Sequence, residues 1–107
     1  MSNYEVNELP ELDRDKLIAI LTDELPVLRA KIGISQDDIS SIIGISRQTY
    51  SAIETKKRKM SWNAFLSLIL FYGYNEKTTN LVEAIGAFPP SLRKTLSINR
   101  RLKEEDE

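Results

Sequence analysis

The chain has 107 residues, a formal net charge of −1, 41% hydrophobic residues, and neither cysteine nor histidine. This length and hydrophobic content suit one domain with a modest core. The missing side chains exclude disulfides, Cys/His zinc sites, thiol nucleophiles and histidine acid–base catalysis, and the four glycines form no phosphate-binding loop. We therefore expect a protein that is not an enzyme and that uses neither a metal nor another cofactor.

The charge is unevenly distributed along the chain. Residues 1–25 carry seven acids and two bases, a balance of −5, whereas residues 26–59 carry seven bases and three acids, a balance of +4. Phosphate binding responds to the local field, so the second segment is the candidate for nucleic acid. No apolar run approaches the roughly 20 residues that span a bilayer. The acidic N-terminus also lacks a signal-peptide pattern, so we expect a cytoplasmic protein without membrane contact.

The chain is expected to begin with an arm and a helix. Residues 1–12 are mostly polar and contain Pro10, which predicts a flexible arm. Asp13 is a plausible N-cap for a helix over about 14–21. Three apolar residues share one face of this helix: Leu17, Ile18 and Leu21.

A proline then interrupts the helical pattern. Pro26 removes one backbone hydrogen bond and disfavours helical angles at the residue before it. We therefore favour two helices, over about 14–21 and 23–32, rather than one kinked helix. Thr22 is the expected cap of the second helix, and Gly33 is expected to end it.

Residues 35–54 contain two short helical patterns around a glycine turn. Ser35 caps the first pattern, and its expected buried stripe is Ile39, Ile42 and Ile43. Gly44 is expected to end this helix in a left-handed conformation. Ser46 caps the second pattern, whose inner face is Tyr50 and Ile53. The short link requires the two helices to cross at a steep angle, and a basic loop follows.

An apolar helix is predicted over about 62–72, with Ser61 as its cap and Gly73 at its end. Apolar residues occupy nearly its whole circumference, which indicates burial on more than one side. One explanation is that the N-terminal helix covers it. The other is a dimer interface formed with residues from 81–98, and the sequence leaves both open.

The C-terminal part has weaker signals. Asn75 is the expected cap of a helix over about 76–86, and a last helix is predicted over 91–98. We expect one domain over 13–88. The extension over 89–107 is expected to be partly disordered, because it ends in a run of acidic residues.

Several positions agree in one register with a known family: Ser35-Gln36-x-x-Ile39, Gly44-Ile45-Ser46, Tyr50-x-x-Ile53-Glu54 and the run of bases that follows. Over about residues 23–86 they resemble the phage-repressor or Cro-type (XRE-type) helix-turn-helix family. The resemblance implies an all-α, lambda-repressor-like five-helix DNA-binding domain. Here the domain would carry an extra N-terminal helix and a short C-terminal extension.

The resemblance also implies which residues touch DNA. The second motif helix, 46–54, would enter the major groove, and its base-contacting residues would be Arg47, Gln48, Thr49, Ser51 and Ala52. Arginine pairs well with guanine and glutamine with adenine, which fits this assignment. The phosphate-contacting residues would be Gln36, Ser46, Lys56, Lys57, Arg58 and Lys59. Glu54 would be structural and would tie the end of the recognition helix to neighbouring backbone.

The chain departs from the family pattern at three places. Ser40 stands where alanine is common, and its hydroxyl can bond to the carbonyl four residues back. Tyr50 stands where an aliphatic residue is usual, and its ring fits if the hydroxyl reaches a partner or water. The loop has Thr55-Lys56 where glycine is frequent, so a residue with a side chain would adopt a positive φ there.

The function implied is a sequence-specific transcriptional regulator of double-stranded DNA, most simply a repressor. A homodimer would read a roughly palindromic operator. The alternative is an antitoxin-like protein-interaction module of a toxin–antitoxin pair that also binds its own promoter. The polar segments 1–12 and 91–107, which can fold on a protein partner, favour this alternative.

Overall fold

The computed structural model describes residues 12–98, and every regular element in this range is a helix, which confirms the all-α class. In chain order the helices are α1 (Arg14–Ile32), α2 (Gln36–Ile43), α3 (Arg47–Glu54), α4 (Trp62–Tyr74), α5 (Thr79–Ala84) and α6 (Pro90–Leu96). The expected N-terminal arm, apart from Leu12, and the expected acidic C-terminal end lie outside the described residues.

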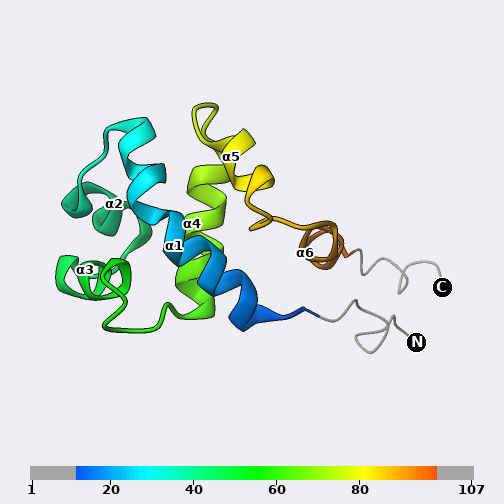
Figure 1. Ribbon diagram of the computed structural model, residues 1–107, viewed down its shortest axis with the longest axis horizontal. Helices are drawn as coiled ribbons and strands as arrows, with labels where there is room; N and C mark the ends of the chain where they lie inside the picture. Colours follow the sequence, from blue (N-terminus) through cyan, green and yellow to red (C-terminus); the bar gives the residue numbers. More distant parts are fainter. Residues whose placement is uncertain (1–11, 99–107) are drawn as a thin grey trace, which may run out of the picture.

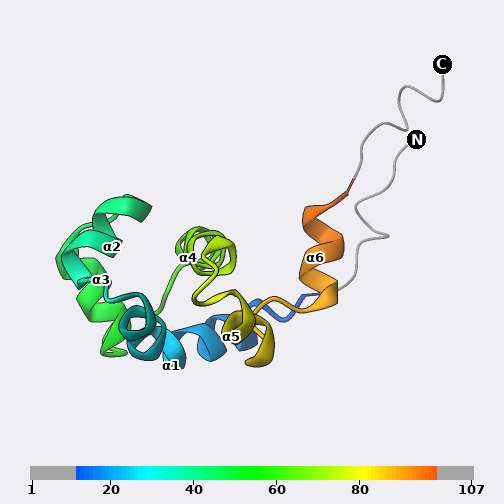
Figure 2. The ribbon, with the colours of Figure 1, turned by 90° about the horizontal axis from the view of Figure 1, so that it is seen from above.

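Helix α4 lies at the centre of the fold. Helices α2 and α3 lie on one side of it and α5 and α6 on the other, while α1 crosses it (Figure 1). In the view from above, α6 stands at the far end from α2 and α3 (Figure 2). The core draws on all six helices through Leu21, Leu25, Leu28, Ile39, Tyr50, Ile53, Phe65, Leu68, Tyr72, Val82 and Leu92. The last helix, expected over 91–98, is observed as α6.

Helix α1 is continuous, so the prediction of two helices over 14–21 and 23–32 is wrong. Continuous winding places residues of both halves in the core: Leu17, Ile18, Leu21, Leu25 and Leu28. Their burial outweighs the roughly 3 kcal/mol that a proline costs inside a helix. Pro26 itself is exposed. Thr22 does not cap a helix, and its hydroxyl donates to the Ile18 carbonyl at 2.7 Å.

The ends of the two motif helices follow the prediction. Ser35 and Ser46 each accept the backbone N–H of the residue three positions on, at 3.0 Å. Gly44 ends α2 with a φ of 83°. Ile39 is buried as expected, but Ile42 is 57% exposed, so the predicted buried stripe is wrong at that residue. No other helix among residues 12–98 covers this side of the last turn of α2, where Ile42 instead lines a groove.

Helix α4 runs one residue past Gly73, and the next helix begins later than expected. The predictions that Gly73 ends α4 and that Asn75 caps a helix over 76–86 are therefore wrong. The side chain of Asn75 accepts the N–H two residues on, at 2.8 Å, which makes a turn. Thr78 is buried and donates its hydroxyl to the Tyr72 carbonyl at 2.6 Å. These two local bonds close α4 and postpone the next helix.

Helix α1 covers one side of α4. The two helices are in contact, and the three residues expected to provide this cover are buried: Leu17, Ile18 and Leu21. At the far end of the contact the Arg14 guanidinium lies 5.0 Å from the centre of the Trp62 ring. On its outer side α4 leaves Leu70 70% exposed and Tyr74 90% exposed. Intrachain packing therefore accounts for only part of the apolar circumference of α4.

Candidate nucleic-acid interface

A partly buried ion pair fixes the position of α3 against α1. The Arg29 guanidinium donates from Nε and Nη2 to the two carboxylate oxygens of Glu54, at 2.9 Å each. Its Nη1 also donates to the Ile34 carbonyl at 3.0 Å. Glu54 is thus structural, as expected, but its partner is a side chain rather than backbone. Arg29 was missed by sequence reasoning, since no helical spacing rule links residues 25 positions apart.

The environment of this pair stabilises both charges. Burial alone would raise the pKa of Glu54, but the hydrogen bonds and positive charge of Arg29 bring that pKa below its ordinary value. The pKa of Arg29 is raised, because its hydrogen bond to Glu54 outweighs desolvation. Both groups are charged at neutral pH, so the end of α3 is joined to α1 by a charged, bidentate hydrogen bond.

Three further polar groups lie in the interior near the motif. Burial raises the pKa of Tyr72 to about 12 and that of Tyr50 higher still. Within residues 12–98 neither hydroxyl has a hydrogen-bond partner, so the partner expected for Tyr50 is not found there. Ser40 is buried, as a small residue between α2 and α3 must be. Its hydroxyl donates to the carbonyl three residues back rather than four.

The outer face of α3 carries a shallow hollow of about 410 Å³. Four of the five residues predicted to contact bases line it: Arg47, Gln48, Ser51 and Ala52. Lys57, a predicted phosphate contact, lines it as well, together with Thr55, which the sequence reasoning did not select. We call this feature the α3 hollow. It brings a bidentate donor, an amide, a hydroxyl and a methyl group together on one exposed surface.

The remaining predicted residues of the motif lie outside the α3 hollow. The Ser46 hydroxyl donates to the Thr49 hydroxyl at 2.9 Å and accepts the Thr49 N–H, so both side chains are engaged in the cap. Thr49 is half-buried. Gln36 occupies the first position of α2 and is also half-buried. The role of these three residues toward DNA stays a prediction.

The basic loop folds back onto the end of α3. The backbone N–H groups of Lys57 and Arg58 both donate to the Ala52 carbonyl, at 2.8 and 3.1 Å. Lys56 has a φ of 67°, as expected for a loop that lacks glycine. A left-handed residue with a side chain costs about 1–2 kcal/mol. The helix-end hydrogen bonds that this conformation allows offset the cost.

The four bases of this loop differ in their partners. Lys56 forms an ion pair with Asp23, and Lys59 forms one with Asp15. Both acids lie on α1, so the structure directs these two lysines toward α1. Lys57 lines the α3 hollow. All four bases also line one hollow between α1 and the loop, together with Asp15 and Asp23.

Two kinds of feature besides the motif would bear on function: a metal-ligand cluster and a membrane-spanning helix. Among residues 12–98 no group of three or more Asp or Glu side chains could hold a metal ion. None of the helices between residues 12 and 98 has the combination of length and hydropathy that a membrane-spanning segment needs.

A family model described as a helix-turn-helix domain matches residues 25–82. This range begins within α1, ends within α5, and includes both the Arg29–Glu54 pair and the α3 hollow. Searches of curated proteins and of solved structures gave no match. The matched segment is more than half of the chain. The chain therefore belongs to the helix-turn-helix domain family of the XRE type, whose members are DNA-binding regulators rather than enzymes.

Proposed function

We propose that the protein is a sequence-specific transcriptional repressor that acts in the cytoplasm and reads the major groove with α3. The observation that carries this proposal is the α3 hollow. There Arg47 and Gln48, the two side chains best suited to guanine and adenine edges, stand on one exposed surface beside Lys57. Lys57 would hold a phosphate, which positions the helix without reading sequence.

The contacts that hold both ends of α3 support a role for this helix in base recognition. The helix has only eight residues, and it is held at its C-terminal end by the Arg29–Glu54 pair and at its N-terminal end by the Ser46 cap. A recognition helix that is already in place does not have to be ordered on binding. The remaining predicted contacts, Gln36, Ser46, Thr49 and Arg58, would add phosphate or base contacts around it.

Arg47→Ala should weaken binding to the operator by about 1–3 kcal/mol and relax the preference at one base pair. Binding to random DNA should change little, because base contacts contribute only on the correct sequence. Arg58→Ala removes the same charge from a predicted phosphate contact, so it should weaken operator and random DNA alike. Fluorescence anisotropy of wild type and both variants, each with both duplexes, measures the six affinities. Equal losses on both duplexes for Arg47→Ala would contradict base reading.

The outer face of α4 supports a homodimer, the form that reads a palindromic operator. A groove of about 430 Å³ between α4, α5 and α6 is lined largely by apolar residues: Leu66, Ile69, Leu70, Tyr74, Val82, Phe88 and Leu96. Three of these are well exposed, at 70% for Leu70, 90% for Tyr74 and 54% for Leu96. Helices α5 and α6, which form this groove with α4, lie on the side of α4 away from α3 (Figures 1 and 2). Two copies joined there would leave both recognition helices exposed.

Leu70→Asp should convert the dimer to a monomer, because it places a charge in the apolar interface. Light scattering coupled to size-exclusion chromatography measures the mass in solution. Val27→Asp is the matched control, since Val27 is a 48% exposed apolar residue on α1 outside the groove. The control should keep the dimer mass. A wild-type protein that remains a monomer at high concentration would contradict the homodimer.

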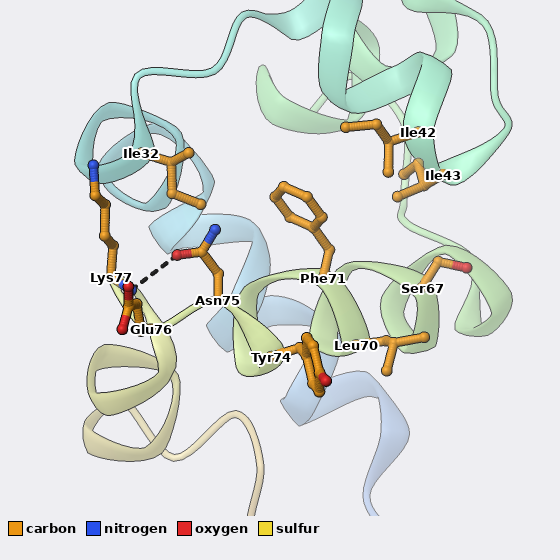
Figure 3. A pocket seen from close by; sticks show the side chains of 10 residues that line it. All are labelled: Ile32, Ile42, Ile43, Ser67, Leu70, Phe71, Tyr74, Asn75, Glu76 and Lys77. Atoms are coloured by element: carbon orange, nitrogen blue, oxygen red, sulfur yellow. Dashed lines mark hydrogen bonds between the residues drawn. The ribbon is translucent and has the colours of Figure 1, made fainter.

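A second candidate function is the antitoxin-like module, and one groove favours it. A hollow of about 1090 Å³ lies between α1, α2 and α4. In it the Phe71 ring stands between Ile32 of α1 and the pair Ile42 and Ile43 of α2 (Figure 3). An amphipathic helix of a protein partner docks in grooves of this kind. Co-purification with the product of a neighbouring toxin gene, lost in Ile42→Asp, would support this function.

A further inference from the structure

Two aspartates on α1 hold two of the four bases in the loop after α3. The Lys56 ammonium lies 2.5 Å from a carboxylate oxygen of Asp23, and the Lys59 ammonium lies 2.5 Å from one of Asp15. The two acids are eight residues apart, so they share one face of the helix about two turns from each other. Ala19 lies between them and lines the hollow of about 410 Å³ that separates α1 from the loop. The loop thus lies along an acidic stripe.

The other two bases of the loop have no such acidic partner. Among residues 12–98 no acid forms an ion pair with Lys57 or Arg58, and both side chains are exposed. Lys57 also lines the α3 hollow. All four bases line the hollow between α1 and the loop, but only Lys56 and Lys59 are paired with acids of α1. A loop built only to hold the DNA backbone would leave all four charges unpaired.

We propose that Asp15 and Asp23 form an acidic clamp that holds Lys56 and Lys59 away from DNA phosphates and so limits non-specific affinity. An aspartate offers a lysine the same kind of anionic oxygen as a phosphate does, and the two compete. The carboxylates also repel a DNA backbone that approaches the loop. This inference rests on the proposed function, because it concerns how strongly the same surface binds DNA.

The clamp would increase the specificity of the protein for its operator over other DNA. A regulator works by the ratio of its operator affinity to its affinity for the many competing sites, not by affinity alone. Phosphate contacts strengthen binding to all DNA alike, whereas contacts of Arg47 and Gln48 strengthen binding only to the operator. Withholding two lysines from the backbone therefore raises the share of binding that depends on sequence.

The two ion pairs of the clamp restrain the lysines only weakly. The four side chains are between 60% and 79% exposed. Ion pairs this exposed are screened by salt and stabilise little. The lysines can therefore exchange an aspartate for a phosphate, and the effect of each aspartate on DNA affinity should be about threefold to fivefold.

Asp23→Asn and Asp15→Asn, singly and together, test the clamp in the full-length chain. Binding to a random duplex is measured by fluorescence anisotropy over a series of salt concentrations. Each substitution should tighten binding about threefold to fivefold at low salt. Each should also steepen the plot of log affinity against log salt by about 0.9, because one more lysine reaches a phosphate. Thermal denaturation checks that the variants fold.

Two controls separate the clamp from a general charge effect. Glu24→Gln changes the net charge equally, one residue from Asp23, at an acid that pairs with no base among residues 12–98. It should leave affinity and salt slope unchanged. In a Lys56→Gln background, Asp23→Asn should lose its effect, because the lysine that it would release is gone.

The outcomes are distinct. Tighter binding with a steeper slope, confined to the two clamp aspartates and dependent on Lys56, supports the inference. Wild-type binding with no change in the aspartate variants, or an equal change in Glu24→Gln, overturns the clamp and leaves the proposed function standing. A wild-type protein that binds no duplex at all overturns both.

Discussion

Glu54→Gln is expected to lower the free energy of unfolding at pH 7 by about 3 kcal/mol, the low end of the range for breaking a buried ion pair. The loss is large because the Arg29 guanidinium, only 22% exposed, would lose the carboxylate that accepts two of its hydrogen bonds. It stays at the low end because the bond from Arg29 to the Ile34 carbonyl remains. Urea denaturation followed by circular dichroism measures the change.

The double variant Arg29→Met/Glu54→Leu is the control for this prediction. It removes both charges at once, so that neither is left unpaired in the interior, and it should cost less than the single Glu54→Gln change. A single variant that lies within about 1 kcal/mol of wild type would contradict a stabilising role for the pair.

The same pair makes stability depend on pH. The folded-state pKa of Glu54 lies below its ordinary value, so the unfolded chain takes up the proton first as the pH falls. The contribution of the pair is therefore fully present above the ordinary pKa of a glutamate, about 4.3. It is lost as the pH falls through the folded-state pKa. The difference in stability between wild type and Glu54→Gln should shrink on acidification from neutral pH, and a constant difference would contradict the pairing.

Leu68→Ala should lower the free energy of unfolding by about 2–5 kcal/mol, because it opens a cavity in the centre of the core. Leu68 lies on α4 and is 0% exposed. Leu70→Ala removes the same atoms from the same helix, but Leu70 is 70% exposed. Its cost should stay within about 0.5 kcal/mol.

Denaturation of both leucine variants at low protein concentration, where association contributes nothing, makes the comparison. Equal costs would mean that Leu70 is covered within the monomer. That result would also remove the main support for a dimer interface on the outer face of α4.

The recognition segment could be predicted well because its signals are local. Ser35 and Ser46 are caps whose hydroxyls reach only three residues ahead, and Gly44 supplies the left-handed residue between them. Each of these features is set by neighbours in sequence. The placement of Arg47 and Gln48 at the exposed start of the recognition helix came from the resemblance to the family, because adjacent residues lie about 100° apart around a helix.

The errors at helix ends have two different causes. Pro26 interrupts a helix in isolation, but the core needs leucines on both sides of it, and the helix continues. There local propensity was overridden by contacts that a single sequence does not display. Gly73 resembles a helix end, yet the local bonds made by Asn75 and Thr78 determine where α4 stops and α5 begins. That error came from choosing the wrong one of several local signals.

At the candidate site, local features could be predicted, whereas contacts between residues far apart in the sequence could not. The partners of Arg29 and of Lys59 lie 25 and 44 residues away, so neither ion pair follows from the sequence. The resemblance to the family implied that all four loop bases contact phosphates. It did not indicate the acidic stripe on α1 that pairs with two of them. Thr49 was assigned to base contact because of its place on the helix, although its hydroxyl is engaged with Ser46.

The most direct test of the account is a fluorescence-anisotropy titration of the wild-type protein against the DNA upstream of its own gene. Random DNA of equal length is titrated alongside, over a series of salt concentrations. We expect binding to one upstream site at least about a thousandfold tighter than to random DNA. Binding to random DNA should be steeply salt-dependent. Weak and equal binding to both duplexes would contradict sequence-specific reading by α3.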